Sequence, residues 1–404
     1  MIHFVSLVII LLFGYNFLVS NLFLLIRPIL YRSLRLSVLH LPTTVGAGAN
    51  GLSFALSRLG FSNRIWAYRQ NYLKYQVDHI IFRNTNFFLF REFFRLISII
   101  YIFRADIFFY NYGSTLFTPP KPSEALSLSH KLQPFHSFFS NYLDLLQTFE
   151  LFLLRMLKKP YFVLYQGDDI RQGSFLEDKY DVSIASVAPP GYYNKMDDNF
   201  KKGQSLRICR HAKHVFFLNP DLASLLPDNS SFLPYSHISI PESPPTVCHS
   251  TVLRIAHAPT NRAVKGTDLI LESLDILRDE GFVFSLDLIE NVSHGEALSR
   301  LSQADLLIDQ LFAGWYGGVA LEFMSYAKPV VCFIRDDDLV AIPSQMSLEL
   351  PVLRIDHLNI LSQLRLILSL DFHELDVVGL KSFEFVKRWH HPSSVAQILE
   401  PYFS

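Results

Sequence analysis

Glu322 lies in a stretch whose residue types favour binding of an anionic ligand. The stretch is predicted to form a buried strand, a glycine-rich loop, a helix and a second buried strand, in the order Ala304–Asp309, Gly314–Gly318, Val319–Ala327 and Val330–Ile334. Glycines leave backbone amides accessible, and amides at a helix N-terminus attract phosphate. Glu322 falls one to two turns into this helix, within reach of a ligand held at its start. An ordinary strand-helix-strand unit with loop glycines is the simpler alternative.

A basic turn further upstream is the second candidate for contact with an anion. The predicted strand Val252–His257 leads into Arg262, Lys265 and Gly266, and Thr267 is predicted to cap the helix that follows. Two fixed cations near a phosphate form charge-assisted hydrogen bonds with it. A solvated surface turn is the alternative interpretation of the same residues.

Both segments resemble the nucleotide-sugar site of group 1 glycosyltransferases (glycosyltransferase family 4), which have the two-domain GT-B fold. The family pattern is a glutamate, seven residues, a second glutamate and then a small residue or Gly-Lys/x-Pro-Val-Val. Here Glu322 and the segment Lys328-Pro329-Val330-Val331 match its second half, whereas the first glutamate position is Gly314. The family also has an Arg and a Lys-Gly at the basic turn.

The resemblance implies roles for these side chains in a retaining glycosyltransferase. Arg262 and Lys265 would neutralise the donor diphosphate, and Glu322 would accept hydrogen bonds from ribose hydroxyls. The other donor-binding candidates are Gly266, Asp309, Gly317 and Gly318, and Asp309 or Gln310 could take the sugar-contacting role of the glutamate missing at Gly314. Positioned cations would stabilise the charge of a leaving nucleoside diphosphate. We therefore expect a nucleotide sugar as co-substrate and neither a metal nor another cofactor.

A second glycine-rich loop follows the predicted strand Leu36–Leu41. Gly46, Gly48 and Gly51 satisfy the GxGxxG dinucleotide pattern, which also needs an acidic residue about 20 positions on. The first acidic residue after this loop is Asp78, so NAD or FAD binding is disfavoured. In the family that the chain resembles, such a loop faces the cleft, and we expect Gly46 and Gly48 to do so, with a helix from residue 52 to 59.

Polar residues at the ends of two further predicted strands are candidates for the acceptor side of a cleft. Asn111 lies at the end of Asp106–Tyr112, and Tyr161–Tyr165 is followed by Gln166, Asp168, Asp169 and Arg171. The carboxyl ends of parallel strands face the ligand crevice of an open α/β sheet. A charged surface turn is the alternative. The proline-containing segment Thr118–His136 is predicted to be a surface loop.

Strand-helix alternation runs through both halves of the 404-residue chain, which predicts an α/β protein with two Rossmann-like domains facing across a cleft. We expect an N-terminal acceptor domain over 36–236, a proline-containing linker over 237–250 and a nucleotide-sugar domain over 251–380. The segment 381–404 is expected to be a C-terminal helix that packs back on the first domain, as in the family.

The first 35 residues are predicted to be a membrane anchor. Phe4–Ile26 contains 23 residues without a charge, enough to cross a bilayer as a helix, and Arg27, Arg32 and Arg35 follow it. The positive-inside rule then places the rest of the chain on the cytoplasmic face of a membrane. A cleavable signal peptide, a buried helix or an upstream start codon are alternatives. The aromatic segment Phe87–Phe103 fits either a membrane-surface helix or a core helix.

Composition limits the classes of function. The net charge of −1 argues against a nucleic-acid binder, and three widely separated cysteines form neither a zinc pattern nor a disulfide framework. The expected function is sugar transfer from a nucleotide-diphosphate sugar to a lipid-linked or polysaccharide acceptor. The alternatives are a nucleotide-sugar epimerase or a phosphorylase on the same fold, a metal-dependent GT-A transferase using Asp336–Asp338, and a non-catalytic membrane scaffold.

Overall fold

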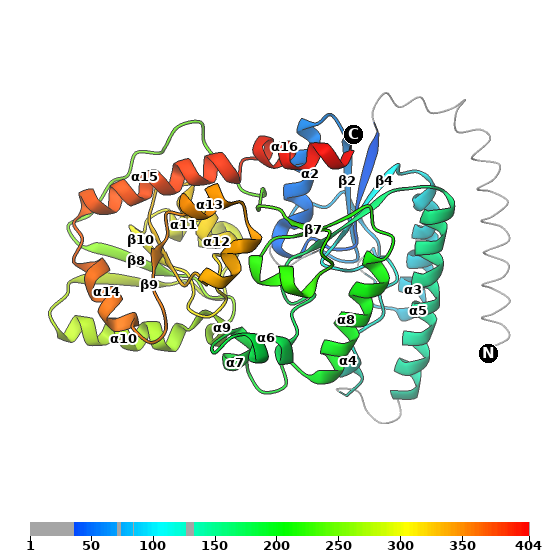
Figure 1. Cartoon of the computed structure of the whole chain (residues 1–404), viewed down its shortest axis with the longest axis horizontal. Helices are drawn as coiled ribbons and strands as arrows, with labels where there is room; N and C mark the ends of the chain where they lie inside the picture. The colour runs from blue at the N-terminus through cyan, green and yellow to red at the C-terminus, as the bar shows by residue number, and fades with distance from the viewer. Residues whose placement is uncertain (1–35, 71–73, 84, 127–132, 404) are drawn as a thin grey trace.

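Two parallel β-sheets, each with helices packed against it, form two α/β units that lie side by side (Figure 1). The computed structural model describes residues 36–403, apart from 71–73, 84 and 127–132. An α/β fold with parallel sheets confirms the predicted fold class. The predicted anchor, residues 1–35, lies outside the described residues. Within the part that is described, no helix is both long enough and apolar enough to cross a membrane.

The first sheet has seven parallel strands in the order β3-β2-β1-β4-β5-β6-β7. The strands are β1 (Ser37–Leu41), β2 (Ser62–Ala67), β3 (His79–Ile80), β4 (Ile107–Asn111), β5 (Tyr161–Tyr165), β6 (His214–Phe217) and β7 (Ser230–Phe232). Strands β4 and β5 are buried at every position, as expected for continuous apolar runs in a sheet covered on both faces. Strand order reverses between β1 and β4, so the loops after these two strands diverge and open a crevice.

Helices cover both faces of this sheet. They are α2 (Gly48–Arg58), α3 (Phe88–Ser98), α4 (Pro122–Leu126), α5 (Gln133–Met156), α6 (Gly173–Lys179), α7 (Ile184–Val187) and α8 (Lys195–Cys209), with short 3₁₀ turns η1 (Val45–Ala47), η2 (Ile99–Phe103) and η3 (Pro220–Leu225). The expected start of α2 at Leu52 was wrong, because positive φ angles at Gly46 and Ala47 turn the chain into a helix by Gly48. The loop predicted over Thr118–His136 was also wrong in part, since it contains α4 and the start of α5.

The second sheet has five parallel strands in the order β12-β11-β10-β8-β9. These are β8 (Leu253–His257), β9 (Phe284–Leu288), β10 (Leu306–Ile308), β11 (Val330–Cys332) and β12 (Leu353–Arg354). Strand β8 pairs with β9 on one side and β10 on the other. The order therefore reverses at β8 and β10, and the loops that follow these strands should bind ligand if the sheet obeys the rule for open α/β folds.

The helices of the second unit are α9 (Arg262–Lys265), α10 (Thr267–Asp279), α11 (His294–Leu301), α12 (Gly318–Met324), α13 (Ser344–Leu348), α14 (Ile360–Leu368) and the 3₁₀ turn η4 (Asp336–Ala341). Thr267 does not cap α10 as predicted. Gly266 occupies the N-cap position with a φ of 73°, and the Thr267 hydroxyl forms a 2.9 Å hydrogen bond with buried His257 instead.

Two C-terminal helices join the units. α15 (Phe372–Trp389) covers the second unit, and α16 (Pro392–Phe403) packs on α2 of the first (Figure 1). Between them, buried His390 forms hydrogen bonds of 2.9 Å with the Tyr316 hydroxyl and 2.8 Å with the Tyr235 carbonyl. Burial lowers the pKa of His390 to about 3, so the ring is neutral at physiological pH.

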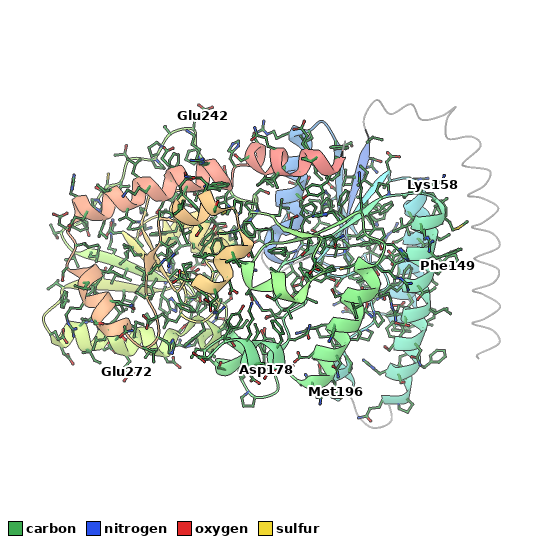
Figure 2. All side chains as sticks on the ribbon, in the orientation of Figure 1. Phe149, Lys158, Asp178, Met196, Glu242 and Glu272 are labelled. Atoms are coloured by element: carbon green, nitrogen blue, oxygen red, sulfur yellow. The ribbon has the colours of Figure 1, made fainter. Side chains whose placement is uncertain are left out.

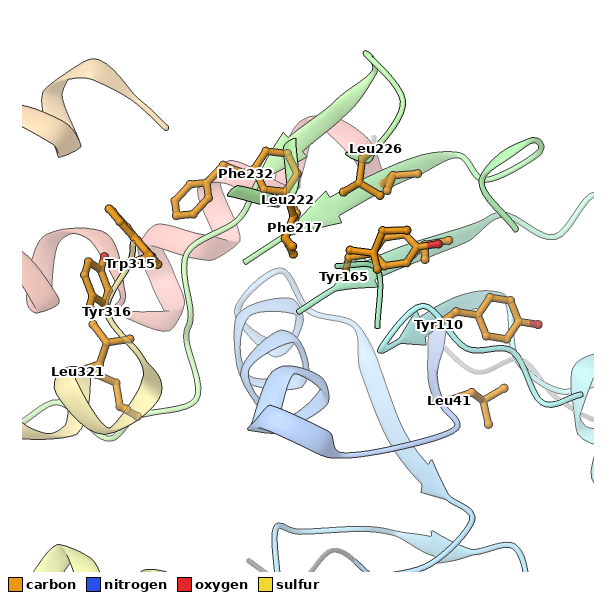
Figure 3. Close-up of a cluster of buried hydrophobic side chains, with 14 of the residues drawn as sticks. Leu41, Tyr110, Tyr165, Phe217, Leu222, Leu226, Phe232, Trp315, Tyr316 and Leu321 are labelled. Atoms are coloured by element: carbon orange, nitrogen blue, oxygen red, sulfur yellow. The ribbon is translucent and has the colours of Figure 1, made fainter. Parts of the chain in front are cut away.

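A continuous apolar core also links the units. Phe232 at the end of β7 packs edge-on against Trp315, with ring centroids 6.1 Å apart, and Trp315 packs against Tyr316 (Figure 3). The same cluster extends from Leu41 in the first sheet to Leu321 in α12. Because the two sheets share this core, the loops at their carboxyl ends are held at a fixed separation.

Candidate functional site

A cavity of about 770 Å³ lies where the carboxyl-end loops of the two sheets meet. Its lining comes from the loops after β1, β2, β8, β9 and β10, from α11 and α12, and from the segment that leaves the first unit. The lining residues are Val45, Gly46, Tyr75, Tyr235, His237, Ala258, Pro259, Thr260, Lys265, Ile289, Asn291, Val292, His294, Ala297, Gly317, Gly318, Val319 and Glu322. Loops after β1, β8 and β10 follow strands at the two positions of reversed strand order, where open α/β sheets bind ligands.

Lys265 is the basic side chain that the structure places in this lining. Its Nζ lies 2.5 Å from Oδ1 of Asp309, a carboxylate with no exposed surface, and the Lys265 side chain keeps 15% exposure. The other Asp309 oxygen accepts a 2.9 Å hydrogen bond from the Gly317 amide. Asp309 therefore holds the loop after β10 against the basic turn after β8, and it partly neutralises the cation that faces the cavity.

Glu322 also lines the cavity, and its partner is a histidine that the sequence analysis did not identify. Oε1 of Glu322 lies 2.7 Å from Nε2 of His294 on α11. This hydrogen bond to the carboxylate raises the pKa of His294 above its usual value. The edge of the Tyr75 ring contacts His294, with centroids 5.8 Å apart. The pair gives the cavity wall two titratable groups in direct contact.

A second unpredicted histidine, His237, follows the last strand of the first unit. Its ring lies against Gly318, since a Cβ added there would be 3.2 Å from His237 Nε2. Burial lowers the pKa of His237, and its Nδ1 has no hydrogen-bond partner among the described residues. Gly318 therefore allows the segment between the units to approach the start of α12 closely.

Arg262 lies outside the cavity lining, although it stands on the same short helix, α9, as Lys265. Its guanidinium forms a 2.9 Å ion pair with Glu290 and a 3.2 Å ion pair with Asp268, and its side chain is 45% exposed. Gly266, the third member of the predicted basic turn, packs against Leu311 with a positive φ. In this conformation the basic turn therefore presents Lys265 to the cavity and holds Arg262 beside it.

Gly314, at the position of the family's first glutamate, is closed off from the cavity. Its φ is 77°, and an added Cβ would lie 2.5 Å from Nη1 of Arg335. That guanidinium is itself held by Asp338 at 3.0 Å and by the Phe312 carbonyl at 3.2 Å. The chain thus has an arginine packed where a glutamate side chain would begin.

Neither Asp309 nor Gln310 takes over the missing glutamate's place in this conformation. Both are buried, and neither belongs to the cavity lining. The Gln310 amide is engaged with the Trp315 and Phe333 carbonyls and the Ala313 amide. Asp309 acts through Lys265, so the suggestion that either residue contacts the sugar directly finds no support in the geometry.

On the side of the first unit, Gly46 reaches the cavity and Gly48 lies behind it. A Cβ on Gly46 would come within 2.5 Å of the Gln166 side-chain oxygen, and one on Gly48 within 2.8 Å of its nitrogen. Gln166 is buried, and both polar atoms of its side chain lack a hydrogen-bond partner among the described residues. A side chain at either glycine would therefore displace the end of the Gln166 side chain.

The remaining acceptor candidates stand behind the cavity rather than in its wall. Asn111 is fully buried, and Asp169 accepts hydrogen bonds from the Gln166 and Gly167 amides. Asp168 accepts hydrogen bonds from the Tyr192 and Tyr193 hydroxyls, whereas Arg171 forms a two-point ion pair with Asp221. These contacts organise the loop after β5, and a role in acceptor binding stays a prediction.

Asp336–Asp338, the segment of the metal-dependent alternative, is engaged in ion pairs. Asp338 contacts Arg335, Lys179 and the Tyr180 hydroxyl, and Asp336 pairs with Arg354. Over the described residues, no group of three or more His, Cys, Asp or Glu side chains is arranged to hold a metal ion.

No protein-family model and no curated protein matches this chain. A sucrose-phosphate synthase from Thermosynechococcus elongatus matches its structure with a TM-score of 0.51 at 12% identity, over 91% of this chain and 98% of that one. The chain has the GT-B fold. At this identity the similarity to the synthase shows the GT-B fold alone and no substrate.

Two further structures match this chain with lower scores. A UDP-GlcNAc 2-epimerase from Neisseria meningitidis, bound to UDP-GlcNAc, has a TM-score of 0.46 at 11% identity over 91% of this chain and 99% of its own. A glycosyltransferase from Streptomyces nogalater has a TM-score of 0.40 at 16% identity over 92% and 100%.

Sequence reasoning found the loops of the GT-B cavity but not all of its side chains. Lys265, Glu322, Gly46, Gly317 and Gly318 were predicted and do line it. His294 offered one usable signal, because it directly follows Ser293, the N-cap of α11, in the loop after β9, a position that faces the crevice in this class of sheet. His237 lies in an irregular segment and offered none.

Proposed function

We propose that this protein is a retaining glycosyltransferase that moves a sugar from a nucleoside-diphosphate sugar to a lipid-linked or polysaccharide acceptor. The observation that carries the proposal is the cavity between the two carboxyl-end crevices of a GT-B fold, with Lys265 and Glu322 in one wall. An ammonium group and a carboxylate that line the same cavity match the two ends of a nucleoside diphosphate, which are anionic phosphate and ribose hydroxyls.

In this proposal Lys265 stabilises the leaving diphosphate. Its Nζ is fixed by buried Asp309, so no side-chain reorganisation is needed when negative charge develops on the bridging oxygen. Asp309 offsets part of the positive charge of Lys265, so the ammonium group acts on the diphosphate as a partly neutralised cation at a fixed position. The Gly317 amide already donates to Asp309, so in this proposal the Gly318 amide is the one that contacts the diphosphate.

Glu322 accepts hydrogen bonds from the ribose, and His294 holds the Glu322 carboxylate in place. The 2.7 Å contact occupies one carboxylate oxygen and leaves the other for the ligand. The first unit, through the loop that carries Gly46, forms the acceptor side. We place the enzyme on the cytoplasmic face of a membrane, which rests on the uncharged run Phe4–Ile26 and the arginines that follow it.

The proposal is tested by assaying sugar transfer from a panel of nucleotide sugars with the full-length enzyme and its variants. We expect Lys265→Ala to lower kcat/KM about 100-fold, since a charge-assisted contact in the transition state is worth ~2–3 kcal/mol. Lys381→Ala, on an exposed position of α15, is the matched control and should retain full activity. Arg262→Ala should cost less than Lys265→Ala, because Arg262 stands outside the lining. Full activity of both Lys265→Ala and Glu322→Ala would refute the proposal.

A nucleotide-sugar epimerase is the second candidate, and one observation favours it. His294 and Glu322 meet in the cavity wall, and an acid-base reaction at the sugar ring needs two such groups. Incubation with the nucleotide sugar alone separates the two functions. An epimerase converts its substrate without an acceptor, whereas a transferase needs one for rapid turnover.

A further inference from the structure

Two helices of the first unit expose large apolar side chains to solvent. We call this surface the aromatic face. It consists of Leu89, Phe90 and Phe93 on α3 and Phe138, Leu145 and Phe152 on α5, each about half exposed or more. Soluble proteins seldom expose contiguous apolar patches of more than about a few hundred Å². Patches above that size mark surfaces that contact a protein or a membrane.

Helices α3 and α5 contact each other near their starts, and both lie on the same flank of the first unit (Figure 1). At their starts, the Phe88 ring packs edge-on against Phe135 and Phe139, with centroids 5.4 and 5.0 Å apart. At their ends, Lys159 donates a 3.1 Å hydrogen bond to the Phe103 carbonyl. The two helices are therefore in contact at their starts, and the segments that follow them are joined as well.

On α5 the exposed apolar residues recur with helical spacing. Phe138, Leu145 and Phe152 are seven residues apart and therefore lie on one side of the helix. The opposite side is buried and includes Leu143, Leu146 and Leu154. The core of the first unit therefore covers one apolar side of α5. In the described structure, no other element covers the second apolar side.

The charges around the aromatic face are basic. Arg83 precedes α3, Arg155 lies in the last turn of α5, and Lys158 follows that helix (Lys158 is labelled in Figure 2). All three are exposed. The two helices contain three carboxylates, and two of them, those of Glu92 and Glu150, are buried. The third, Asp144, forms an ion pair with Arg207. An apolar face with exposed basic residues and no exposed free carboxylate complements the headgroups of an anionic membrane.

The described chain begins at this flank. Ser37 forms 2.8 and 3.0 Å hydrogen bonds with Asp106, which follows η2 at the C-terminal ends of α3 and α5. The uncharged run Phe4–Ile26 ends ten residues before Ser37 in the sequence. Even fully extended, a linker of that length spans only about 35 Å. A membrane reached by this run would therefore be close to the aromatic face.

We propose that the aromatic face rests on the surface of a bilayer that contains anionic lipids. Its phenylalanine and leucine side chains enter the boundary between headgroups and acyl chains, and Arg83, Arg155 and Lys158 contact lipid phosphates. None of the residues that line the cavity comes from α3 or α5, so this docking leaves the cavity open. The inference does not depend on the proposed sugar transfer.

Tryptophan fluorescence tests this docking directly in the full-length chain. Phe90→Trp and Phe138→Trp each place an indole on the aromatic face, and Leu366→Trp on α14 is the matched control, at a position that is 71% exposed. Each variant is reconstituted into vesicles of phosphatidylcholine and phosphatidylglycerol, with and without brominated phosphatidylcholine, which quenches indoles that reach the acyl chains. The three native tryptophans give a common background.

The proposal predicts at least twofold stronger quenching at positions 90 and 138 than at 366, and weaker quenching when phosphatidylglycerol is omitted. Equal quenching at all three positions would overturn it. An indole at 138 that emits at short wavelength but is not quenched would also overturn it, because another segment of this chain or a second copy would then cover the face. Quenching that is unchanged without anionic lipid would contradict the role given to the basic residues.

Discussion

Gly314 shows most clearly how one residue separates this protein from the family pattern. A glutamate there would need a left-handed backbone and would collide with a guanidinium that three groups already hold. The sequence revealed the substitution, but only the structure shows that Arg335 occupies the space. Reintroducing a glutamate is therefore expected to damage the fold rather than restore a ligand contact.

Gly314→Glu should lower the free energy of unfolding by about 2–4 kcal/mol, from ~1 kcal/mol for the positive φ and the rest from displacement of Arg335. Gly191→Glu is the matched control, because Gly191 has a φ of 83° with open space where a Cβ would go, and it should lose about 1 kcal/mol. Chemical denaturation measures both. An equal loss of unfolding free energy in the two variants would show that Arg335 moves aside at no energetic cost.

The His294–Glu322 pair predicts a pH dependence of stability. The folded pKa of His294 lies above its unfolded value, so the stabilisation is complete below the ordinary pKa of 6.5 and is lost as pH rises through the folded pKa. His294→Gln should thus be less stable than the wild type by up to about 1 kcal/mol under acidic conditions, and the difference should shrink as the solution becomes alkaline.

Glu322→Gln provides the control for that measurement, since it removes the charge that raises the histidine's pKa. In its background, the stability difference caused by His294→Gln should lose its pH dependence. A difference that grows with pH would contradict the assigned cause.

At the scale of elements, the sequence predicted most strands and the loops that carry Lys265 and Glu322. Short, fully apolar runs such as β4 and β5 are direct signals of a covered parallel sheet. Helix α5 was missed because its first residues fall in a proline-containing segment that favours a loop. The approach of His294 and His237 depends on how α11 and the segment between the units pack, and local sequence does not encode that.

The contact of α15 with the turn after α12 supplies a prediction about an element. A Cβ on Gly379 would lie 2.1 Å from the Ala327 carbonyl oxygen, so this glycine sets how closely α15 approaches the second sheet. Gly379→Ala should cost about 1–3 kcal/mol by forcing the helix outward, as overpacking does. Chemical denaturation of the purified variant measures that cost.

Gly203→Ala is the control for helix propensity, because Gly203 lies within α8 with open space around its Cβ position. This variant should gain up to about 1 kcal/mol. If both alanine variants became more stable, a methyl group would fit between α15 and the Ala327 carbonyl, and the close contact assigned to Gly379 would be wrong.

At the scale of the whole molecule, several connections hold the two crevices opposite each other. They include the aromatic contact of Phe232 with Trp315, the hydrogen bonds of buried His390 and the packing of α16 on α2. The sequence predicted two α/β units on the GT-B plan. It did not predict which of two neighbouring basic residues would face the cavity, since Arg262 and Lys265 stand on one short helix and only tertiary packing distinguishes them.

The central claim is that the cavity binds a nucleoside diphosphate through Lys265 and Glu322. Isothermal titration calorimetry of the full-length protein with UDP, GDP, ADP, CDP and TDP tests it most directly. We predict that at least one diphosphate binds and that Lys265→Ala raises its Kd about 10- to 100-fold, corresponding to ~1.4–2.7 kcal/mol, whereas Lys381→Ala leaves the Kd unchanged. Glu322→Ala should also weaken binding. Absence of binding by every diphosphate, or a Kd that neither cavity variant alters, would contradict the claim.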